Sequence, residues 1–229
     1  MIKDLKLAFR ILKYGLQGKS MLMLFGIFMA IGIMMECAAT SVMDNMGGIY
    51  MVLCPTYITQ MIITGTISLY IGSSPYKRRL QTSIPTEVAY LLSLLCFGLF
   101  ATIRLCRLYL GTPELTDELL KHQLYGIIMV ASLVFILQIY GSVAYKSYIL
   151  SLVIFLPMFV FLFVGQGWLQ GKVELIPPVA AFLGKGPVVI MVVAVLIITL
   201  GAVAAYAITC AMYKRDIDPK IYKRILARA

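Results

Sequence analysis

Long apolar runs recur along the whole chain, separated by short polar segments. An α-helix needs about 20 apolar residues to cross the hydrocarbon core of a membrane. The pattern therefore predicts six membrane spans, at residues 21–43, 49–73, 87–109, 123–143, 147–168 and 187–213. Little sequence is left for a soluble domain. We expect an all-α integral membrane protein with a single transmembrane domain over residues 1–229.

The two ends of the chain follow a different pattern. In residues 1–20, apolar side chains recur at alternating spacings of 3 and 4, and basic side chains follow the same rhythm on another face. This pattern predicts an amphipathic helix lying along the membrane surface. Residues 214–229 are rich in Lys and Arg and predict a basic cytoplasmic tail.

A broken apolar segment, "QGKVELIPPVAAFLGKG", lies between the fifth and sixth predicted spans. Pro177 and Pro178 interrupt it, and the stretch between its glycines is too short to cross a membrane. Irregular backbone at membrane depth has to be shielded from lipid. The segment therefore predicts a re-entrant or interfacial turn.

Composition agrees with this architecture. The chain is 61% hydrophobic and 13% charged, with a mean hydropathy of +0.93, which excludes a water-soluble domain of this size. The net charge of +10 is not a sign of nucleic-acid binding, because the basic residues stand at the ends of apolar runs. Most of the 20 Lys and Arg residues fall on one side of the six spans, and basic loops favour the cytoplasm. We expect a multi-pass plasma-membrane protein with both termini cytoplasmic.

The segment "GLQGKS", residues 15–20, ends like a phosphate-binding loop. Such a loop requires Gly-x-x-x-x-Gly-Lys-Ser/Thr between a strand and a helix, so that backbone N–H groups surround the phosphates. Here Lys13 stands where the first glycine is needed, and an apolar run follows Ser20. We expect no cofactor and no nucleotide site on this chain. No hydrolase or metalloprotease motif is present, so we expect no enzymatic activity from it.

Ionisable residues inside a span are costly and raise a functional question. Glu36 is the only acid well inside a predicted span, and two interpretations stay open. It forms a structural ion pair with Arg104 or Arg107, or it lines a transport path. Gln60 and Gln138 either face that path or join helices by hydrogen bonds.

Metal binding is a weaker hypothesis. His122, the single histidine, follows the acidic residues Glu114, Asp117 and Glu118, which together resemble a set of metal ligands. One imidazole at the entrance of a span is more typical of an interfacial residue, so we predict no metal site. The five cysteines lack the paired spacing of metal or redox sites and are predicted to be packing residues.

The polar segment between the second and third spans, residues 75–86, is the most informative stretch. It reads "PYKRRLQTSIPT", longer and more basic than a simple connection requires. We expect a short turn of helix ended by Pro85. Together with the amphipathic N-terminal helix, the six spans and the broken turn, its Leu-x-x-Ser-x-Pro pattern resembles the type-2 ABC exporter permeases, among them the small Gram-positive group that exports antimicrobial or cytolytic peptides or confers immunity to them.

The resemblance implies roles for these residues. The segment would be the coupling helix that contacts a separate ATPase subunit, through Tyr76, Lys77, Arg78, Arg79, Leu80, Ser83 and Pro85. ATP and Mg²⁺ would bind that partner, and the N-terminal helix would be the elbow helix. A second permease subunit, identical or related, would complete the path. The cargo would be an amphipathic peptide or a lipid-like or drug-like molecule, and membrane lipids would surround the subunits.

Two other classes of protein stay open. A stand-alone channel or secondary transporter would work without an ATPase partner, and it would be favoured by internal symmetry or by charges at mid-membrane. A membrane-embedded enzyme would need a set of polar catalytic residues at one depth, and the sequence offers none that is evident.

Overall fold

The structure is a computed structural model that describes residues 18–38, 45–66, 77–111, 116–144, 146–169 and 177–214. All regular secondary structure in these ranges is helical. The helices are α2 (Gly18–Ala38), α3 (Met46–Thr66), α5 (Lys77–Gln81), α6 (Ser83–Gly111), α7 (Asp117–Ala144), α8 (Tyr148–Leu169), α9 (Pro177–Leu183) and α10 (Pro187–Met212). Within the described residues, four helical segments are long and apolar enough to cross a membrane: Met46–Ile63, Lys77–Leu110, Asp117–Ala144 and Pro187–Met212. The fold is therefore that of a helical membrane protein.

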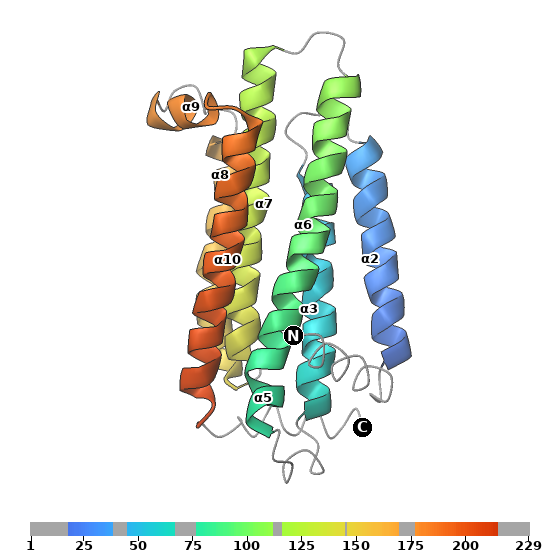
Figure 1. Ribbon diagram of the computed structural model, residues 1–229, viewed down its shortest axis with the longest axis vertical. Helices are drawn as coiled ribbons and strands as arrows, with labels where there is room; N and C mark the ends of the chain where they lie inside the picture. Colours follow the sequence, from blue (N-terminus) through green and yellow to red (C-terminus); the bar gives the residue numbers. More distant parts are fainter. Residues whose placement is uncertain are drawn as a thin grey trace.

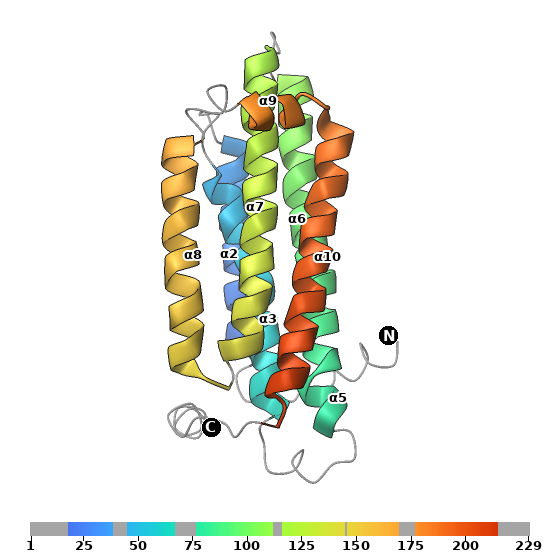
Figure 2. The same cartoon turned by 90° about the vertical axis from the view of Figure 1, so that its left-hand side faces the viewer.

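The long helices run side by side along one axis (Figures 1 and 2). The short helix α5 lies at one end of this bundle, and the short helix α9 lies at the other end. We refer to these as the α5 end and the α9 end. Helix α7 is the central element, since it contacts α3, α6, α8 and α10. Accordingly 56% of the apolar 18-residue stretch of α7 is buried in the bundle, against 28% of the corresponding stretch of α10.

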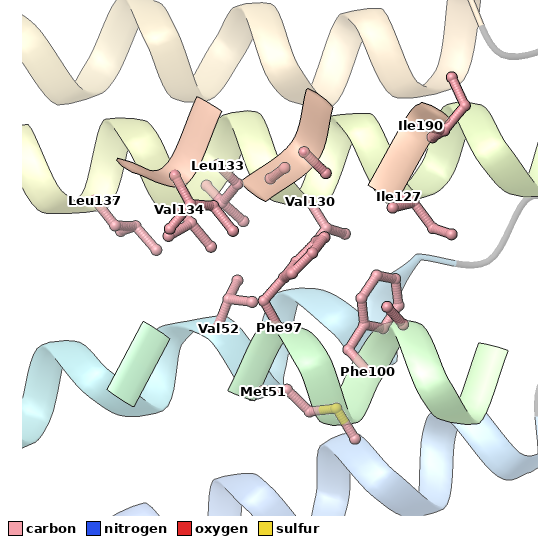
Figure 3. Packing of buried hydrophobic residues seen from close by; sticks show 14 of the residues in the cluster. Met51, Val52, Phe97, Phe100, Ile127, Val130, Leu133, Val134, Leu137 and Ile190 are labelled. Carbon is pink, nitrogen blue, oxygen red and sulfur yellow. The ribbon is translucent and has the colours of Figure 1, made fainter. Parts of the chain in front are cut away.

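The core lies between α3, α6, α7 and α10. Phe97 of α6 reaches toward Val130 of α7, with Val52 of α3 nearby (Figure 3). Within lipid, helices associate through close packing rather than through exclusion of water. Small residues allow that closeness: a Cβ at Gly201 of α10 would stand 2.9 Å from the Cα of Phe135 on α7.

Helix α6 begins earlier than the sequence predicts. The third span was expected over 87–109 with Pro85 ending a separate helix before it, but α6 starts at Ser83 and contains Pro85 in its first turn. The break falls at Thr82 instead, between α5 and α6. The physical reason is that the first N–H groups of a helix have no intrahelical partner, so proline costs no hydrogen bond there. The prediction for Pro85 was wrong.

Other predicted boundaries are tested only in part. Helix α2 begins at Gly18, so residues 18–20 belong to it, and the rest of the predicted elbow helix, 1–17, lies outside the described residues. The same holds for residues 170–176 and for the tail beyond Lys214. The described part of the broken segment is the seven-residue helix α9, followed by Gly186 with φ 94°, a left-handed conformation that favours glycine.

Candidate functional site

Buried charged and polar side chains gather toward the α9 end of the bundle. We call Glu36, Asn45, Arg104 and Arg107 the charge cluster. The Nε atom of Arg104 donates a hydrogen bond to Oε1 of Glu36 at 2.7 Å, and neither side chain is exposed (0% and 0%). Nη1 of Arg104 donates to Oδ1 of Asn45. Arg104 thereby binds the end of α2 and the start of α3 at once.

Two further contacts complete the surroundings of Arg104. Its guanidinium lies 4.7 Å from the centre of the Phe100 ring, one turn earlier on α6, which is a cation–π distance. Arg107, the next turn along, donates from Nη1 to the backbone oxygen of Glu36 at 2.7 Å. This oxygen is among the last carbonyls of α2, which lack intrahelical partners, so Arg107 satisfies the end of that helix.

Three glycines make room for the charge cluster and for Phe100 beside it, because a Cβ at any of them would overlap these side chains. A Cβ at Gly47 would lie 2.7 Å from the backbone nitrogen of Glu36 and 2.8 Å from its Oε2. At Gly48 it would lie 2.5 Å from Phe100, and at Gly126 of α7 it would collide with Arg104 Nη1 and Asn45 Oδ1. The backbones of α3 and α7 therefore approach the cluster as closely as the chain permits.

The structure contains the ion pair predicted as one of two alternatives for Glu36, and Arg104 is its main partner. Oε1 of Glu36 is 4.0 Å from Nη2 of Arg107, a weaker contact than the one with Arg104. Oε2 is buried and has no hydrogen-bond partner among the described residues. Because the carboxylate is fully enclosed, it could line a path only after the helices around it separate. A role in transport stays a prediction.

Asn45 and the three glycines were not predicted as site residues. The second span was expected to begin at residue 49, whereas α3 starts at Met46 and includes both Gly47 and Gly48. A signal was present: two adjacent glycines disfavour a helix, so their place at the start of one indicates a close approach. What they approach depends on Arg104, which is far away in sequence.

The two glutamines lie away from the charge cluster. Gln60 is exposed on α3, about 22 Å along the helix axis from Asn45 at about 1.5 Å per residue. Gln138 lies between α7 and α10, where it is 7% exposed, and a Cβ at Gly201 would stand 2.6 Å from its Oε1. Neither Oε1 nor Nε2 of Gln138 has a partner among the described residues. Of the four residues predicted to line a path or to form an ion pair, Glu36, Gln60, Gln138 and Arg104, the structure brings together Glu36 and Arg104.

Replacing Gln138 with methionine is expected to stabilise the bundle by about 1 kcal/mol, because it removes a buried amide without hydrogen bonds and keeps the side-chain length. Unfolding of the purified chain in detergent would measure this change. The exposed Gln60→Met provides the control and should leave stability within about 0.5 kcal/mol. A loss of stability in Gln138→Met would mean that water or a polar group binds the amide.

Of the acidic residues near His122, Asp117 forms an ion pair with a lysine. Oδ2 of Asp117 lies 2.6 Å from Nζ of Lys121, one turn along α7. Among the described residues no group of three or more His, Cys, Asp and Glu side chains could hold a metal ion. Glu114 lies outside the described residues. His122 is half-buried in the first two turns of α7, and its Nδ1 has no partner in the described part of the chain.

The predicted coupling segment forms a second site, at the α5 end. Arg78 and Arg79 are exposed on α5, while Leu80 is 5% exposed. Leu80 packs in a small apolar cluster with Ile58, Met61 and Ile62 of α3 and with Ile84 and Val88 of α6. Hydroxyl groups reinforce the junction, since Thr82 Oγ1 donates to the Arg78 carbonyl at 2.7 Å and Ser83 Oγ donates to that of Arg79 at 3.4 Å. Tyr76 lies outside the described residues.

The α5 helix is thus attached on one side and basic on the other. Its apolar residue Leu80 is buried in the cluster with α3 and α6, and its two arginines, Arg78 and Arg79, are exposed. No family model matches this sequence, and no curated protein or solved structure shows significant similarity to it. The architecture and the two sites define the class: a helical membrane protein with a buried charge cluster toward one end and an anchored basic helix at the other.

Proposed function

We propose that the chain is the membrane-spanning permease subunit of an ATP-driven ABC exporter. Helix α5 carries this proposal. A soluble partner that binds Arg78 and Arg79 would act on α3 and α6 directly, because Leu80 packs against both helices. ATP would be hydrolysed on that separate subunit, and a second permease subunit, identical or related, would complete the transport path.

The proposal includes a six-span topology in the plasma membrane. Helices α2 (21 residues) and α8 (22 residues) are long enough to cross beside the four spans described above. The start of α2 and the end of α10 both lie at the α5 end of the bundle (Figure 1). That end also carries basic residues from distant parts of the chain: Lys77 of α5, Lys146 between α7 and α8, and Lys214 after α10. Basic residues favour the cytoplasm, so the α5 end would be cytoplasmic and so would both termini.

The cargo class follows from the resemblance described above and from the surface of the bundle. Large apolar side chains are exposed along α8 and α10, for example Val153, Leu156, Leu196 and Leu200. In the assembly these faces would contact lipid or the second permease subunit. An amphipathic peptide or a lipid-like or drug-like molecule could reach such a path sideways from the membrane.

Purification tests the proposal. The tagged chain is isolated from its own cells in mild detergent, copurifying proteins are identified, and ATP hydrolysis is assayed. We expect an ATP-binding subunit to copurify. Arg78→Ala with Arg79→Ala should lower the recovered partner or the coupled hydrolysis about tenfold, which corresponds to about 1.4 kcal/mol of binding energy.

Lys185→Ala is the matched control, because it removes an exposed cation at the opposite end of the bundle. It should leave both readouts unchanged. A chain that copurifies with no ATP-binding subunit, and that is indifferent to the arginine substitutions, would contradict the exporter proposal.

A secondary transporter or channel is the second candidate. The buried Glu36–Arg104 pair favours it, because ionisable groups inside spans are typical of ion and proton pathways. Uptake of an ion by vesicles containing the purified chain alone, lost in Glu36→Gln, would support this candidate over the first.

A further inference from the structure

The charge cluster joins helix α6 to the α2–α3 pair. Glu36 belongs to α2 and Asn45 directly precedes α3, while Arg104 and Arg107 belong to α6, which packs against α3, α7 and α10. The three short contacts of the cluster, Glu36 with Arg104, Asn45 with Arg104 and Arg107 with the Glu36 carbonyl, all cross from the α2–α3 pair to α6. The cluster therefore fastens α6 to this pair on the side of the α9 end.

Helix α5 contacts α3 and α6 at the other end of the bundle. Leu80 belongs to one apolar cluster with Ile62 of α3 and Ile84 of α6. From these positions to the charge cluster, each helix runs without a break, about 26 Å along α3 to Asn45 and about 30 Å along α6 to Arg104. Two continuous helices thus connect the α5 contact with the charge cluster.

The cost of leaving buried charges unpaired would divide the cluster between two discrete arrangements rather than a continuous range. While the helices are together, the Glu36 and Arg104 charges are enclosed and satisfy each other. Partial separation would leave both charges unpaired and without water, which is the costliest arrangement of a buried pair. Wider separation would let water reach them. An element with two such states can act as a switch.

We propose that the charge cluster is a lock that holds the α9 end of the bundle closed, and that α5 acts on this lock through α3 and α6. The second half of this proposal rests on the proposed function, since it needs a partner that moves α5. The first half, the lock itself, does not rest on the proposed function, because it is inferred from the contacts within this chain.

Two native cysteines report on the lock. Cys37 on α2 follows Glu36, and Cys106 on α6 lies between Arg104 and Arg107; both are exposed. With Cys54, Cys96 and Cys210 replaced by alanine, spin labels at these two positions measure the separation of α2 and α6 by pulsed electron paramagnetic resonance. The full-length chain is used in lipid nanodiscs, with helicity and elution volume as checks of folding.

Glu36→Gln is expected to raise the fraction of the longer distance from about a tenth or less to a half or more, because Arg104 loses its counter-charge and gains water on opening. If Glu36→Gln fails to fold, Arg104→Lys replaces it, since a lysine cannot reach Glu36 and Asn45 with one planar group. Lys121→Met, which breaks an exposed ion pair on α7, is the control and should change nothing. An unchanged distance distribution in a folded Glu36→Gln or Arg104→Lys chain overturns the lock.

Leu80→Ala tests the connection with α5. Sites this far apart normally act additively. We expect Leu80→Ala to change the open fraction about twofold or more in the Glu36→Gln chain, whereas Leu95→Ala, an exposed leucine on α6, changes nothing. No effect of Leu80→Ala overturns the link to α5. Because these measurements need no ATPase, failure of the exporter proposal would be detected separately, in the copurification.

Discussion

Loss of either charge of the Glu36–Arg104 pair is expected to lower the free energy of unfolding by about 3–5 kcal/mol. Both side chains are fully buried, so Glu36→Ala leaves a guanidinium, and Arg104→Met leaves a carboxylate, without its counter-charge. In Arg104→Met the amide oxygen of Asn45 also loses a donor. Denaturant or thermal unfolding of the purified chain in detergent would measure the effect.

The double variant separates the cost of an orphaned charge from the value of the pair. We expect Glu36→Leu with Arg104→Met to cost less than the sum of the two single variants by about 2 kcal/mol or more, since neither buried charge is left. Lys121→Met removes an exposed pair and should cost less than about 1 kcal/mol. Additive single variants would contradict a direct interaction between Glu36 and Arg104.

Gly47→Ala is expected to destabilise the chain by about 2–3 kcal/mol, although alanine normally favours a helix over glycine. The added Cβ would stand 2.7 Å from the backbone nitrogen of Glu36, and backbone atoms cannot move aside as a flexible side chain can. Helices α2 and α3 would have to separate, and this would disturb the contact between Glu36 and Arg104. The same unfolding measurement applies.

Gly98→Ala on α6 is expected to have the opposite effect on stability. Nothing lies within 4 Å of a Cβ built at Gly98, so only the backbone effect acts there. That effect should stabilise the helix by about 0.5–1 kcal/mol. Equal effects of Gly47→Ala and Gly98→Ala would show that the close approach of α2 and α3 is not needed for stability.

The membrane character of the chain and the approximate place of its long helices could be predicted from the sequence. Both depend on local composition, because a span must be apolar over its own length whatever surrounds it. The start of α6 was predicted less well. The sequence contains Pro85, but the same proline suits either the end of one helix or the first turn of the next. In the structure Pro85 lies in the first turn of α6, and Leu80 and Ile84 pack in one apolar cluster.

Some residues of the candidate site could likewise be predicted from the sequence, and others could not. From the sequence, Glu36 stood out as an acid inside an apolar run, and Arg104 and Arg107 stood out as its possible partners. The choice of Arg104 as the main partner could not be read from the sequence, because it depends on how far α2 and α6 slide past each other. The roles of Asn45 and Gly126 could not be predicted for the same reason, since both depend on contact with Arg104.

The sequence by itself determined that this is a helical membrane protein with basic residues at the ends of its helices, since hydrophobic length and charge placement are local properties of the chain. Only the tertiary structure decided that residues 68 positions apart form one buried ion pair, and that a five-residue basic helix is attached to two long helices at once. Contacts between distant segments depend on the relative shift and rotation of whole helices. This shift and rotation are set by packing, to which glycines contribute as well as charged residues.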